Sequence, residues 1–86
     1  MKRKTVEEAA RVRLAWEVRF EVKCLAGKLA GVHPTELIYY DDGRIILPDS
    51  TVCVIPIAGA MDAWLAGRLQ EYVETEWAIS KLSGGV

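Results

Sequence analysis

The segment from Val12 to Leu25 alternates hydrophobic and polar residues, and this alternation fits two secondary structures. A period of two is typical of a strand with one buried face. Wound as a helix, the same segment has two apolar stripes on nearly opposite sides. The first stripe comprises Leu14, Val18, Val22, Leu25 and Leu29. The second, which we term the aromatic stripe, comprises Ala9, Val12, Trp16, Phe20 and Cys24.

We predict one helix from Val6 to Ala30, with a long strand as the alternative. Alanine, leucine, glutamate, arginine and lysine make up most of this segment, and all five favour helix. Thr5 and Glu8 fit a capping box at its start. Gly31, with a proline shortly after it, favours an end to the helix at this point.

The two stripes raise the question of what covers each of them, because a surface helix needs only one buried stripe. One interpretation is that a second helix covers one stripe and a sheet covers the other. The other interpretation is that a partner protein covers Trp16 and Phe20. The sequence leaves both interpretations open.

Short β-rich segments follow the first helix. We predict strands at residues 36–40, 44–47 and 51–55. Asp41-Asp42-Gly43 predicts a tight hairpin turn, because Asp-Gly supplies the positive φ angles that such a turn requires. Pro48-Asp49-Ser50 predicts a second turn.

Helical periodicity returns from Ala60 to about Leu82 and predicts a second long helix. The motif Leu25-Ala26-Gly27-Lys28-Leu29 of the first helix recurs there as Leu65-Ala66-Gly67-Arg68-Leu69. Glycine inside a helix costs about 1 kcal/mol relative to alanine. We hypothesise that the two glycines let the helices cross closely, with a chance repeat as the alternative.

These elements predict one α+β domain over residues 1–86. It has a long N-terminal helix, a three-stranded antiparallel β-meander and a long C-terminal helix (α-β-β-β-α), with both helices on one face of the sheet. We expect residues 1–4 to form a basic frayed N-terminus and residues 83–86 a flexible tail. A domain of this size hides only about 60–65% of the surface that its unfolded chain exposes, so its stability is expected to be marginal without a partner.

Composition and charge narrow the protein's class. The chain is 51% hydrophobic and 27% charged, which argues against disorder, and its apolar runs are too short to span a membrane. Lys2-Arg3-Lys4 is not followed by an apolar segment, so we expect no secretory leader and a cytoplasmic location. The net charge of -1 hides an asymmetry, with eight basic and four acidic residues up to His33 and three basic and eight acidic residues after it. Such polarity suits association with charged partners or with a second copy.

Side chains that support catalysis are scarce. His33 is the only histidine, and its place before Pro34 in a connection predicts a capping or loop role. Cys24 and Cys53 are too few for a zinc site and are expected to be buried reduced thiols. We therefore predict no enzymatic activity, no metal, no cofactor and no small-molecule substrate.

The sequence gives only a weak indication of nucleic-acid binding. The segment from Leu25 to Leu37 resembles the turn of helix-turn-helix proteins, but a hairpin follows where the recognition helix would continue. Arg11, Arg13 and Arg19 are candidates for weak phosphate contacts. Nucleic acid is therefore not expected to be the principal partner.

The C-terminal half contains a tyrosine-bearing hairpin, a return strand and a helix. The hairpin reads Ile38-Tyr39-Tyr40-Asp41-Asp42-Gly43-Arg44-Ile45-Ile46-Leu47, and the helix carries Ala63-Trp64-Leu65. This layout resembles that of some small phage-encoded anti-CRISPR proteins. The resemblance implies helices packed on a short antiparallel sheet, and acidic side chains that imitate nucleic-acid phosphate to block a basic channel. It points to Asp41, Asp42 and Asp49 as the first candidates for contact.

We therefore expect a small non-enzymatic protein-binding protein, and more specifically a phage or mobile-element inhibitor of a nucleic-acid-processing complex. The candidate partner-binding residues are Asp41, Asp42, Asp49, Glu36, Trp16 and Phe20. One alternative is a self-associating structural or assembly protein, a homodimer joined through the Trp16 and Phe20 stripe or a strand edge. Another is a weak nucleic-acid-binding regulator.

Overall fold

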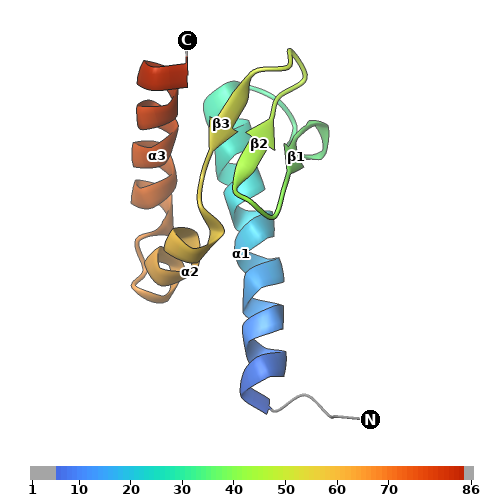
Figure 1. Cartoon of the computed structure of the whole chain (residues 1–86), viewed down its shortest axis with the longest axis vertical. Coiled ribbons are helices and arrows are strands. Elements are labelled where there is room, and N and C mark those ends of the chain that lie inside the picture. Colours follow the sequence, from blue (N-terminus) through green and yellow to red (C-terminus); the bar gives the residue numbers. More distant parts are fainter. Residues whose placement is uncertain (1–5, 85–86) are drawn as a thin grey trace.

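The chain folds into helices on one side of a small antiparallel sheet (Figure 1). The computed structural model describes residues 6–84. Its elements are α1 (Val6–Ala30), the 3-10 helix η1 (Pro34–Glu36), β1 (Ile38–Tyr39), β2 (Arg44–Ile46), β3 (Val52–Val54), α2 (Ile57–Leu65) and α3 (Leu69–Gly84). The predicted α+β class and the order α-β-β-β-α are confirmed. Thr5 of the predicted capping box and residues 1–4 lie outside the described residues.

The segment that fits both a strand and a helix is helical, and α1 has the predicted bounds. Val18 and Val22 on its first stripe are fully buried. The helix ends as predicted, because Gly31 has a φ of +73° and the Val32 N–H reaches back to the Gly27 carbonyl at 2.9 Å. This is the hydrogen bond that closes a helix at a left-handed residue.

The two hairpins of the sheet share one loop design. In the first, the Tyr40 N–H donates to the Arg44 carbonyl at 2.8 Å, and Gly43 adopts a φ of +94° at the end of a three-residue loop. In the second, the Leu47 N–H donates to the Thr51 carbonyl at 2.9 Å, and Ser50 takes the left-handed position with a φ of +72°. Each loop therefore needs one left-handed residue, and in the first hairpin that residue is glycine.

One hydrophobic core joins the inner face of the sheet to all three α-helices. Each strand alternates, so that Tyr39, Ile45 and Cys53 point inward while their neighbours are exposed or half-buried. Against them pack buried residues of the helices and of the chain that flanks the strands: Val18, Val22, Ala26, Leu37, Leu47, Ile55, Ala60, Leu69, Val73 and Trp77. No buried polar or charged side chain lies among the described residues.

The predicted C-terminal helix is wrong in one respect, because it is two helices that meet at Gly67. Gly67 has a φ of +73°, its N–H donates to the Trp64 carbonyl, and the Arg68 N–H donates to the Ala63 carbonyl at 2.7 Å. This pair of bonds is a Schellman motif, which ends α2. Leu65, the last residue of α2, is 67% exposed to solvent. At its other end α3 continues to Gly84, so residues 83–84 are helical rather than part of a tail.

The hypothesis of a close helix crossing at the two repeated glycines is also wrong. A Cβ at Gly27 would meet the Val32 carbonyl oxygen at 2.8 Å, so this glycine accommodates the following loop. A Cβ at Gly67 would have no neighbour within 4 Å. The close approach between helices occurs instead at Gly59 of α2, whose Cβ would lie 2.7 Å from the ring carbon Cζ of Tyr72.

Candidate functional site

The aromatic stripe of α1 is uncovered where its rings lie. Trp16 is 69% exposed and Phe20 is 64% exposed, whereas Val18 and Val22 on the opposite side of the helix are fully buried. Val18 lies between the two rings in the sequence and is fully buried, so the rings are exposed because of the side of the helix on which they lie. The sheet and α3 lie beside the C-terminal half of α1, and its first turns extend beyond both (Figure 1). Since nothing in the described part of the chain covers the two rings, the interpretation that a helix and the sheet cover both stripes does not hold.

Helix α2 approaches the stripe from one side through Trp64, which is 37% exposed. An open hollow lies between them, lined by Trp16, Glu17, Phe20, Glu21 and Trp64. A second hollow adjoins it toward the N-terminus, lined by Ala9, Ala10, Arg13, Leu14, Glu17 and Trp64. We define the aromatic face as Val12, Trp16 and Phe20 of α1 together with Trp64 of α2. It combines a ridge of rings with a hollow beside it.

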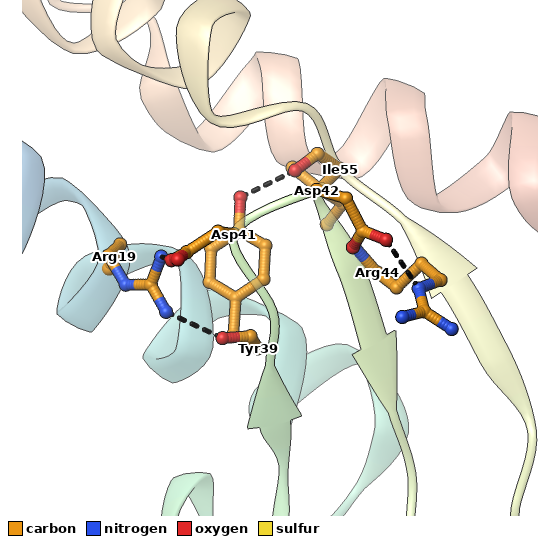
Figure 2. A network of polar contacts seen from close by, with 6 residues as sticks. All are labelled: Arg19, Tyr39, Asp41, Asp42, Arg44 and Ile55. Carbon is orange, nitrogen blue, oxygen red and sulfur yellow. Dashed lines mark hydrogen bonds and ion pairs between the residues drawn. The ribbon is translucent and has the colours of Figure 1, made fainter.

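Arg19 holds α1 against the first hairpin. Its Nη1 donates to the Asp41 carboxylate at 2.7 Å and its Nη2 to the Tyr39 carbonyl at 2.6 Å (Figure 2). The Cζ atom of its guanidinium also lies 5.9 Å from the Trp16 ring centroid and 5.3 Å from that of Tyr39, so it makes a cation–π contact with each ring. Of the three arginines predicted to contact phosphate, Arg19 is therefore engaged within the molecule, whereas Arg11 and Arg13 are exposed.

The acidic candidates at the hairpin tip are paired with arginines. Asp41 is bound by Arg19, and Asp42 accepts from the Arg44 backbone N–H at 3.1 Å and from its Nε at 2.7 Å (Figure 2). The Arg44 N–H, with the guanidinium beside it, holds the pKa of Asp42 below its usual value. Asp41 remains accessible, with a side chain 98% exposed.

The other two acidic candidates stabilise their own turns. Asp49 accepts from the Thr51 backbone N–H at 2.9 Å, and the hydrogen bonds from the Thr51 side chain and backbone lower its pKa. Glu36 accepts from the His33 N–H at 3.0 Å, while the His33 side chain accepts from Thr35 and caps η1. The structure thus gives His33 its predicted capping role. It does not bring the four acidic candidates together into one cluster with the two rings.

Side chains already occupy backbone groups at both edges of the sheet. On the β1 edge, Arg19 binds the Tyr39 carbonyl. On the β3 edge, the Ser80 hydroxyl of α3 accepts from the Val54 N–H at 3.0 Å and donates to the Val54 carbonyl at 3.3 Å. A strand added at either edge would have to displace these contacts.

The outer face of the sheet is a second apolar surface, which we did not single out from the sequence. Its exposed or half-exposed residues come from all three strands and the first hairpin: Ile38, Tyr40, Ile46, Val52 and Val54. Arg44 lies 4.9 Å from the Tyr40 ring centroid in the same face. The period of two in the strands predicts these outward positions, and their apolar character is the signal that identifies the surface.

The metal-binding and thiol side chains of the described residues are dispersed. No group of three or more His, Cys, Asp or Glu side chains that would hold a metal lies among residues 6–84. Cys24 and Cys53 are free thiols, half-buried and buried respectively, and burial raises the pKa of Cys53. None of the helices in this part of the chain is long and apolar enough to cross a membrane.

Comparison of the chain with protein-family models, with curated proteins and with solved structures finds no match.

Proposed function

We propose that the protein is a small non-enzymatic protein-binding domain and that the aromatic face is its contact surface. The observation that carries the proposal is the exposure of Trp16 and Phe20, at 69% and 64%, on neighbouring turns of a helix whose other side is buried. Contiguous exposed apolar residues of this kind mark interaction sites in soluble proteins.

The free energy gained by covering the two rings supports the aromatic face as the contact surface. A Trp or Phe side chain buries about 150–250 Å², so covering the exposed two-thirds of each ring is worth about 2.5–4 kcal/mol. Interface hot spots are enriched in Trp, Tyr and Arg, and they combine a ring with a pocket. The aromatic face offers this combination, because Trp16 and Phe20 lie beside the hollow that Trp64 closes on one side.

The acidic hairpin is the contact implied by the resemblance to anti-CRISPR proteins, with a nucleic-acid-processing complex as the partner class. The 98% exposure of the Asp41 side chain favours this second candidate. We rank it below the aromatic face because Arg19 and Arg44 neutralise Asp41 and Asp42. Replacing both aspartates with lysine tests it: loss of inhibition or of partner binding by a folded variant is the expected result.

Affinity capture with matched variants tests the aromatic face. The wild-type chain, the double variant Trp16→Ala/Phe20→Ala and the control Leu82→Ala are immobilised and exposed to extract of the native host. Leu82 suits the control because it is 88% exposed and lies on α3. We expect the wild type and the control to retain the same protein, in the same amount relative to the immobilised chain. The double variant should lose it. Retention of every captured protein by the double variant would contradict the proposal.

A further inference from the structure

The charges along one flank of the aromatic face run in a fixed order. Arg13, Glu17 and Glu21 follow one another at intervals of four residues, so they share one side of α1 next to the Trp16 and Phe20 ridge. All three are exposed, and none forms an ion pair within the described part of the chain. Glu17 and Glu21 repel each other at this spacing. The flank is thus positive toward the N-terminus of α1 and negative toward its middle.

We infer that the occupant of the aromatic face is a second copy of this chain, with the two α1 helices packed antiparallel about Trp16. This inference rests on the proposed function, because it names the partner of the same face. When two copies are related by a two-fold axis at Trp16, Arg13 of one lies opposite the segment that carries Glu17 and Glu21 in the other. In a parallel pair this flank would instead face the other side of the partner's stripe, whose cations are Lys23 and Arg19, and Arg19 is already bound to Asp41.

The shape of the face is complementary to itself in the same arrangement. A two-fold interface brings the same patch of both copies together, so it needs a projection and a recess on one surface. The ridge of Trp16 and Phe20 provides the projection, and the hollow between α1 and Trp64 provides the recess.

The area available predicts a weak dimer. Two rings that are about two-thirds exposed offer roughly 200–330 Å² per copy, and Val12, Trp64 and the charged flank add to this. A standard stable interface buries about 800 Å² per partner. Association is therefore expected to depend on concentration, with a Kd on the order of micromolar or weaker.

Sedimentation equilibrium of the full chain from about 1 μM to about 1 mM tests the proposal, because this range covers weak association. The wild type should dimerise, and Trp16→Ala/Phe20→Ala should weaken association about tenfold or more. The controls Leu82→Ala on α3 and Ile38→Ala on the outer sheet face should leave the Kd unchanged. A strict monomer at about 1 mM would overturn the second copy as the occupant. Whether the aromatic face binds a different protein would then be tested by the capture experiment.

Charge variants test the antiparallel arrangement. Arg13→Glu alone, and Glu17→Lys with Glu21→Lys, should each raise the Kd about 3- to 10-fold because each leaves like charges opposite one another. The triple variant carrying all three changes restores opposite charges and should return the Kd to the wild-type range. A triple variant as weak as the other two would overturn the antiparallel arrangement. A dimer that survives loss of both rings but weakens in Ile38→Ala would assign the interface to the sheet instead.

Discussion

Among single residues, Tyr39 connects the sheet to the start of α2. Its hydroxyl donates to the carbonyl of Ile55, which directly precedes Pro56 at the N-cap of α2 (Figure 2). Burial raises the pKa of Tyr39 far above its usual value of 10.0, against the opposing charge of Arg19. The folded protein therefore keeps Tyr39 neutral at a pH where the unfolded chain ionises it.

This difference predicts alkaline destabilisation. A folded-state pKa above the unfolded one gives stability that is complete below about pH 10 and decreases as the pH rises past that value. Urea denaturation at about pH 8 and pH 10.5 should show a larger loss for the wild type than for Tyr39→Phe. At neutral pH the variant should lose about 1–2 kcal/mol, since the Ile55 carbonyl is left without its partner. If the wild type and Tyr39→Phe lost the same free energy of unfolding between the two pH values, Tyr39 would have the same pKa in the folded and unfolded states.

The left-handed positions of the two hairpins predict opposite effects of substitution. Ser50→Gly should raise the free energy of unfolding by about 0.5–1 kcal/mol, because glycine relieves the strain at a φ of +72°. Gly43→Ala should lower it, since the new Cβ would be strained at a φ of +94° and only 3.2 Å from the Ile55 carbonyl oxygen. Thermal denaturation measures both. A lower melting temperature for Ser50→Gly would be inconsistent with the described loop.

At the scale of elements, local sequence predicted α1, the hairpins and the order of the fold. The spacing of Val18 and Val22, Gly31 at the end of the helix, and the Asp-Gly turn each act over a few residues. The break at Gly67 escaped prediction because Leu65 and Leu69 keep the helical interval of four across it. Only the structure shows that Leu69 is buried and Leu65 is not. A glycine after a run of apolar helix residues was the available signal.

The substitution Gly67→Ala distinguishes one continuous helix over residues 57–84 from two helices, because the free energy of unfolding should change in opposite directions. Gly67→Ala should lower the free energy of unfolding by about 1–2 kcal/mol, because alanine is strained in the left-handed position that ends α2. Gly67→Asn should cost less, since asparagine tolerates this conformation. In a continuous helix the alanine variant would instead be more stable by about 1 kcal/mol. Chemical denaturation of the three proteins separates the two arrangements.

The candidate site was predictable only in part. Two apolar stripes on one helix follow from the sequence, and they identify Trp16 and Phe20 as residues that need a cover. Which stripe the chain itself covers depends on tertiary packing, such as that of α2 against α3, where Tyr72 contacts Gly59 and donates to the Pro56 carbonyl. The pairing of Asp41 with Arg19 joins residues 22 positions apart and has no local signal.

At the scale of the whole molecule, one side of α1 stabilises the fold, and we propose that the opposite side binds the partner. Trp16→Ala/Phe20→Ala should change the free energy of unfolding of the monomer by about 1 kcal/mol or less, mainly through the lost contact of Trp16 with Arg19. Val22→Ala, on the buried side, should cost about 2 kcal/mol. Denaturation at low micromolar concentration compares the two. A large loss in the ring variant would mean that the rings support the fold rather than a partner.

The most direct test of the aromatic face uses the three tryptophans as reporters. In a chain labelled with 5-fluorotryptophan, 19F NMR with a paramagnetic additive measures the solvent access of each ring, and Trp16→Phe and Trp64→Phe assign the resonances. The dilute protein should show Trp16 as the most accessible and Trp77, which is 7% exposed, as the least. Raising the protein concentration, or adding a captured partner, should then protect Trp16 and Trp64 while leaving Trp77 unchanged. A Trp16 resonance that stays fully accessible in every complex would contradict the proposal that this face binds protein.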